Sequence, residues 1–97
     1  MATRGGARTL GLDNEIGSVE VGKKADLIVV ERGAVHVTPD RDPYSTLVYA
    51  AGGRDVRITL VDGELLVDQG QPTRVSRAEL VAQATRAARD LASRAGV

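Results

Sequence analysis

The sequence predicts an α+β fold in which a helix, a strand, a short helix, a hairpin and a long helix follow one another. Residues 55–69 alternate apolar and polar side chains around Asp62-Gly63, a dipeptide that tolerates the positive φ of a two-residue hairpin turn. Residues 76–97 instead repeat their apolar side chains at helical spacing. The run from Leu27 to Val30 is short, mostly β-branched and bounded by turn residues, which is typical of a strand.

The first segment, residues 1–12, is predicted to form a short helix that ends at Gly11. Gly5 and Gly6 weaken this helix, because each costs about 1 kcal/mol relative to alanine. A helix of about ten residues does not persist alone in water. The segment is therefore expected to pack against another element.

The run Leu27–Val30 is predicted to be buried on both faces, since a solvated strand would alternate more cleanly. The stretch from Ala34 to Val37 is predicted to add a second brief strand. Gly22 precedes a lysine, but a phosphate-binding loop has a helix after its lysine, whereas a strand follows here. Gly22 is therefore expected to be a turn residue.

Residues 42–53 predict a short helix. Asp42 is expected at its N-cap and Pro43 at its first position, where the missing N–H costs nothing. Gly52-Gly53 would end it. Its buried side is predicted to carry Leu47, Val48 and Ala51, and its tyrosines, Tyr44 and Tyr49, to be partly buried.

The hairpin is predicted to span residues 55–69. Its two-residue turn sets a register in which Leu60 faces Leu65 and Ile58 faces Val67. That register gathers the apolar side chains on one face of the sheet.

The last helix is predicted to run from Arg77 to Ala95. Ser76 and Glu79 predict a capping box, in which hydroxyl and carboxylate satisfy backbone donors reciprocally. Arginines on this helix are interleaved with acids, which favours a solvated face over a nucleic-acid stripe. An apolar stripe along the helix carries Leu80, Val81, Ala84, Ala87, Ala88, Leu91 and Ala95.

The composition excludes several classes of partner. Thirteen basic and thirteen acidic side chains balance over 97 residues, so neither nucleic acid nor an anionic membrane is an expected partner. The absence of cysteine excludes disulfides, and no apolar run approaches a membrane span or a signal peptide, so a cytoplasmic protein is expected. Aromatic residues make up only 2%, so the thin core predicts marginal stability or self-association.

The sequence predicts no catalytic, cofactor-binding or metal-ligating residue in this chain. An enzyme site needs a nucleophile with a base, a metal cage or a phosphate-binding loop, and none assembles from these residues. His36 is the only histidine. Its nearest acids, Asp40 and Asp42, are better explained as turn and capping residues, so His36 is interpreted as a packing or surface histidine.

Four segments taken in order resemble the C-terminal region of the amidohydrolase superfamily. They are ATRGGARTLGL, IGSVEVGKKADLIVVE, TPDRDPYSTLVYAAGGRDVRITLVDGELLVDQG and the capped final helix. The closest resemblance is to the branch of methylthioadenosine/S-adenosylhomocysteine deaminases and triazine chlorohydrolases. Within that resemblance, DPYSTLVYAA points to the deaminase branch.

The resemblance implies a fragment of a larger architecture. Residues 1–12 would be the end of the last helix of a TIM barrel, and residues 13–75 the returning, C-terminal half of a composite β-sandwich. Residues 76–97 would be a C-terminal helix packed against the barrel. In such a parent enzyme, zinc or iron activates water to hydrolyse a non-peptide C–N bond, deaminating an aminated N-heterocycle.

No position of this chain matches the family's metal-binding or acid–base motifs, so the resemblance implies a structural, inactive chain without a cofactor of its own. Its partner would be the missing TIM barrel, present in cis or in trans. The alternative is a stand-alone binding or scaffold module that docks through an exposed sheet edge and the apolar helix stripe. The same sheet edge predicts a homo-oligomer.

Overall fold

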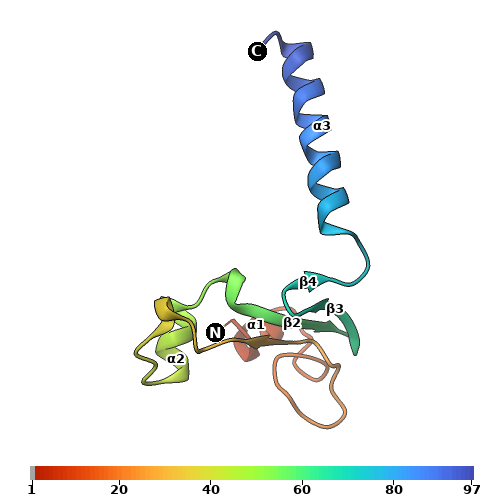
Figure 1. Ribbon diagram of the computed structural model, residues 1–97. Coiled ribbons are helices and arrows are strands. Elements are labelled where there is room, and N and C mark those ends of the chain that lie inside the picture. The colour runs from red at the N-terminus through yellow and green to blue at the C-terminus, as the bar shows by residue number, and fades with distance from the viewer. Residues whose placement is uncertain (1) are drawn as a thin grey trace.

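The computed structural model describes residues 2–97 and shows two parts, a sheet with short helical segments and a long helix that projects from it (Figure 1). The sheet has four antiparallel strands in the order β1-β2-β3-β4. The helices and strands are α1 (Arg4–Thr9), β1 (Leu27–Val30), the 3₁₀ helix η1 (Val35–Val37), α2 (Pro43–Ser45), the π-helical turn η2 (Thr46–Ala50), the 3₁₀ helix η3 (Gly53–Asp55), β2 (Val56–Val61), β3 (Glu64–Asp68), β4 (Gln71–Pro72) and α3 (Arg77–Ala95).

The hairpin of β2 and β3 forms with the predicted turn but only part of the predicted register. Asp62 and Gly63 adopt φ values of 50° and 77°, and Leu60 pairs with Leu65 as expected. The predicted pairing of Ile58 with Val67 is wrong, because Val67 pairs with Thr59 after an irregularity in the ladder. The two adjacent leucines of β3 interrupt its alternation, and one extra residue there is accommodated as a bulge.

Strand β1 is an edge strand, which corrects the prediction that it is buried on both faces. It pairs with β2 on one side only, and Ile28 and Val29 remain 55% and 45% exposed. A strand buried on both faces needs a layer above and below it, whereas this sheet is a single layer. The prediction for residues 34–37 was also wrong. Those residues form η1, in which the Ala34 carbonyl accepts hydrogen bonds from the Val37 amide and the Thr38 hydroxyl, both at 3.0 Å.

The helix after Asp42 begins as predicted, with the Asp42 carboxylate accepting hydrogen bonds from the amides of Tyr44 and Ser45. Its predicted buried side is wrong at Leu47 and Val48, because Thr46 is the buried residue, whereas Ala51 is half-buried. The amide of Ala51 donates to the Thr46 carbonyl five residues back, so the π-turn rotates the side chains away from α-helical spacing. The exposed side chains include the predicted core residues Leu47 and Val48 and both tyrosines, Tyr44 and Tyr49.

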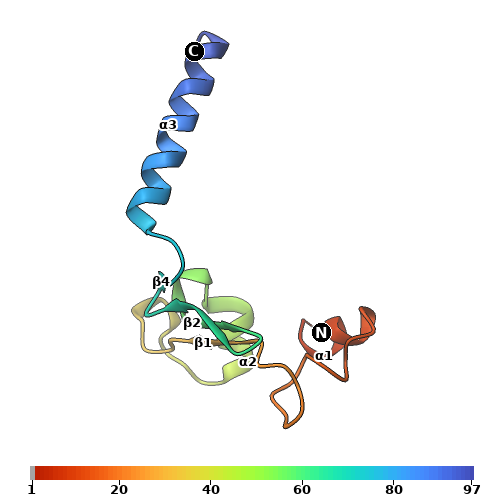
Figure 2. The ribbon, with the colours of Figure 1, turned by 90° about the vertical axis from the view of Figure 1, so that its right-hand side faces the viewer.

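Helix α3 has the predicted bounds and lies apart from the sheet (Figure 2). The Ser76 hydroxyl accepts a hydrogen bond from the Glu79 amide at 3.3 Å, and Gly96 ends the helix with a φ of 74°. The Glu79 carboxylate accepts from Gln83, not from the Ser76 amide that a reciprocal capping box requires. The apolar stripe of α3 is exposed, with Leu91 at 66%.

The interior is small for the length of the chain. Its buried side chains are those of Ala7, Val37, Thr46 and Asp55. The radius of gyration is 18.1 Å, whereas a folded domain of this size has about 13 Å. No helix within residues 2–97 combines the length and the apolar character needed to cross a membrane. Much apolar surface of this fold is therefore left without a covering layer.

Candidate functional site: a histidine–aspartate network and an apolar groove

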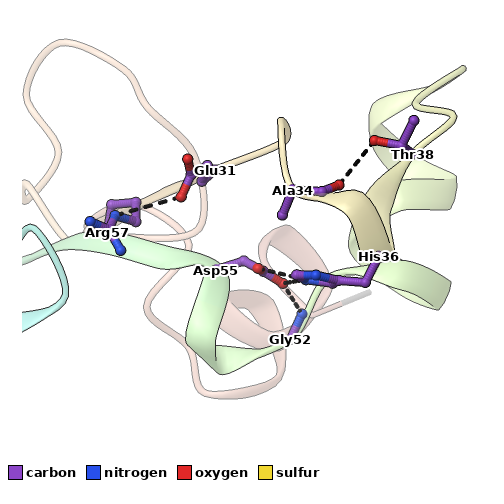
Figure 3. Close-up of polar contacts among 7 residues, drawn as sticks. All are labelled: Glu31, Ala34, His36, Thr38, Gly52, Asp55 and Arg57. Atoms are coloured by element: carbon purple, nitrogen blue, oxygen red, sulfur yellow. Dashed lines mark hydrogen bonds and ion pairs between the residues drawn. The ribbon is translucent and has the colours of Figure 1, made fainter.

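The lone histidine lies against a buried carboxylate (Figure 3). The Nε2 atom of His36, in η1, is 2.7 Å from Oδ1 and 2.8 Å from Oδ2 of Asp55. Asp55 ends η3 just before β2 and is only 4% exposed. His36 is thus held by an acid 19 residues away along the chain.

Asp55 also accepts hydrogen bonds from backbone amides of two other segments. Its Oδ2 accepts a hydrogen bond from the Gly52 amide at 2.8 Å, and its own carbonyl accepts from the Glu31 amide at 2.7 Å. The Gly52 amide and the His36 ring hold the pKa of Asp55 below its usual value. Through its carboxylate Asp55 therefore joins η1 to the loop after η2, and through its backbone carbonyl it also holds the exit of β1.

A second network joins Arg32, Asp40 and Thr46. Asp40 forms an ion pair with Arg32 and accepts a hydrogen bond from the Thr46 hydroxyl at 2.7 Å. Both contacts lower the pKa of Asp40, the Arg32 contact most. Asp42 serves as the helix cap, as predicted, and its hydrogen bonds with Ser45 and Tyr44 lower its pKa.

The acids nearest to His36 in the sequence are not its partners in the fold. Asp40 and Asp42 are its neighbours in sequence, but each is engaged elsewhere, and the histidine pairs with Asp55. The only signal for Asp55 was its position after Gly52-Gly53 and before a strand, which is typical of a turn residue. Such a signal does not reveal a partner that the fold brings close from 19 residues away.

The His36–Asp55 pair resembles the orienting half of a catalytic or metal site, but nothing completes it. Within residues 2–97, no group of three or more His, Cys, Asp or Glu side chains is placed to hold a metal ion. Asp55 already accepts from two donors. Its hydrogen bonds make the pair a structural clamp between η1, η3 and the Gly52 backbone.

An apolar groove of about 610 Å³ lies between α1 and the sheet. Its lining includes Ala7 of α1, the C-cap residue Leu10, Leu27 of β1, Leu60 of β2 and Ile16 of the loop between α1 and β1. Gly17, with a φ of 95°, packs where a Cβ would lie 2.7 Å from that of Ala7, so only glycine allows this close approach. The lining of the groove carries mostly apolar atoms.

Comparisons with known sequences and with solved structures indicate the same protein family. A sequence model described as the Amidohydrolase family matches residues 1–66. The 5-methylthioadenosine/S-adenosylhomocysteine deaminase of Moorella thermoacetica is 46% identical over 86 residues, which cover 89% of this chain and 20% of that protein. The 5'-deoxyadenosine deaminase of Methanosarcina acetivorans is 45% identical over 95 residues, covering 98% of this chain and 22% of that protein.

Solved structures show the same fold for this segment. An adenosine deaminase from Xanthomonas campestris with bound zinc superposes with a TM-score of 0.80 at 41% identity, covering 88% of this chain and 19% of that one. Atrazine chlorohydrolase from Arthrobacter aurescens, complexed with zinc, gives a TM-score of 0.76 at 29% identity, covering 89% and 19%. The chain thus spans about a fifth of the length of its relatives, and it belongs to the amidohydrolase family.

Proposed function

We propose that this chain is the C-terminal structural part of a metal-dependent hydrolase that removes an amino group from a nitrogen heterocycle. One observation carries the proposal: deaminases of adenosine derivatives share about 45% identity with nearly the whole chain, which spans only a fifth of their length. The reaction of the parent enzyme would be hydrolysis of a non-peptide C–N bond on the ring. The contribution of this chain would be to complete the fold around that site.

The uncovered surfaces support a structural role. The groove beside α1, the open edge of β1 and the stripe of α3 leave apolar side chains exposed to solvent, as a surface that docks a partner does. A barrel in the same polypeptide or in a separate chain would cover them. In that arrangement residues 1–12 end the last barrel helix, 13–75 return as half of a composite β-sandwich, and 76–97 pack on the barrel.

The residues present do not fit the metal of the family. Two of the solved relatives are described with zinc, which needs at least three protein ligands in a catalytic site. His36 is committed to Asp55, and residues 2–97 bring no three suitable donors together. The zinc or iron of the parent would therefore be held by residues outside this stretch, and no catalytic step is assigned here.

Metal analysis of the purified chain tests this role. We expect substoichiometric zinc and iron and no conversion of 5'-methylthioadenosine to its inosine analogue. The full-length Moorella deaminase, purified in the same way, is the matched control. One tightly bound metal ion per chain, or turnover above background, would show that the chain has a site of its own.

A further inference from the structure

A hollow of about 390 Å³ lies between the sheet and the start of α3, outside the network and groove described above. Three arginines are among its lining residues, Arg54 in η3, Arg57 in β2 and Arg77 at the first position of α3. The amides of Gln69 and Gln71 add neutral polar groups, and no described lining residue is acidic. In a chain whose charges balance overall, the hollow is a local concentration of positive charge.

Glu31 and Asp55 leave hydrogen-bond donors of Arg57 and Arg54 available. Glu31 approaches Arg57 through Nε at 3.7 Å (Figure 3), which is longer than a direct charge-assisted hydrogen bond of about 2.8 Å. The Nη1 atom of Arg57 lies over the turn at Gly70, 3.4 Å from where a Cβ would stand, and Gly70 itself lines the hollow. Asp55, next to Arg54 in the chain, is occupied by His36 and Gly52.

We propose that this hollow binds a phosphate group, either inorganic phosphate or the phosphate of a small monoester. Forked guanidinium groups match phosphate oxygens in paired hydrogen bonds, and a dianion balances more of the three positive charges than a carboxylate does. The volume falls within the range of about 300–1,000 Å³ that small-molecule sites occupy. This inference does not depend on the proposed function, because none of the lining residues belongs to the groove beside α1, the edge of β1 or the apolar stripe of α3.

Titration of the 97-residue chain with inorganic phosphate, followed by amide NMR, tests the proposal. We expect saturable shifts at Gly53 and Gly70, which line the hollow, and displacement of phosphate by adenosine monophosphate. Adenosine, which lacks the phosphate, is expected to cause no shift there. Equal affinities would identify inorganic phosphate as a sufficient ligand, whereas a tighter monophosphate would identify a monoester; both support the site.

The double variant Arg54→Gln/Arg57→Gln is expected to weaken phosphate binding at least tenfold. Arg89→Gln/Arg94→Gln, which removes the same charge from the far half of α3, is the matched control and should change it less than twofold. If the first variant does not fold, Arg77→Gln at the exposed start of α3 gives the same test. If the control pair weakens phosphate binding equally, the effect comes from net charge alone and the proposal is overturned. Chemical shifts that do not saturate with phosphate would also overturn it.

Discussion

At the scale of single residues, Asp55 joins three separate segments of the fold. Its carboxylate contacts the His36 ring and accepts a hydrogen bond from the Gly52 amide, and its backbone carbonyl accepts one from the Glu31 amide. Asn at this position keeps the size but loses the charge and one acceptor oxygen. We therefore expect Asp55→Asn to lower the urea midpoint of unfolding clearly.

Asp68→Asn, at an exposed position of β3, is the matched control and should leave the midpoint unchanged. His36→Gln is expected to act in the same direction as Asp55→Asn but less strongly, because Gly52 still donates to the carboxylate. The clamp assignment fails if the Asp55 and Asp68 variants unfold at the same urea concentration.

Three carboxylates contribute to the loss of folding stability at acidic pH. Asp40, Asp42 and Asp55 all have pKa values held below the ordinary value by hydrogen bonds and charges in the fold. Because the unfolded chain binds protons more readily, their contribution is present above the ordinary carboxyl pKa of about 4 and is lost as the pH falls through the lowered values. Urea midpoints measured from pH 7 down to about pH 2 should fall steeply below pH 4. A flat profile over that range would contradict the assignment.

At the scale of elements, α3 depends on its ends because its apolar stripe is exposed. The Ser76 hydroxyl accepts from Glu79, and Ser76→Ala should destabilise the helix by about 1 kcal/mol. Amide exchange in the first turn of α3 is expected to accelerate about fivefold, the ratio that this free energy corresponds to. Ser93→Ala, inside the helix, is the control and should not accelerate it.

The sequence predicted those elements whose signals are local. The cap at Asp42, the turn at Asp62-Gly63 and both ends of α3 are specified by residues within one turn of each other, and all form. The bulge opposite Thr59 and the π-turn at Thr46 depend on contacts between elements. They shift side chains by one position, which is why Ile58, Leu47 and Val48 were misplaced.

Strand β4 was missed for a related reason. It has only two residues, one of them proline, and follows a second tight turn in which Gln69 and Gly70 have positive φ. Glutamine is not a typical residue for that conformation, so the sequence pattern did not predict a turn at this position. The partner of His36 likewise could not be predicted, because a contact between residues 19 positions apart has no local sequence signature.

At the scale of the whole molecule, the exposed apolar surfaces predict self-association when no barrel covers them. The edge of β1 and the stripe of α3 offer a second copy both backbone pairing and apolar contact. Light scattering should show an average mass that rises with concentration. Leu80→Gln/Leu91→Gln is expected to reduce that rise, whereas Gln83→Ala, elsewhere on α3, should not. A monomer that unfolds reversibly and sharply at all concentrations would contradict this prediction.

The central claim is that this chain supplies structure to an active site that other residues build. Reconstitution tests it most directly: the Moorella deaminase lacking its matching 86 residues is combined with this chain, and deamination of 5'-methylthioadenosine is measured. The account predicts no activity from either piece alone and substantial activity from the mixture. Turnover by this chain alone, or a truncated enzyme that is fully active without it, would contradict the claim.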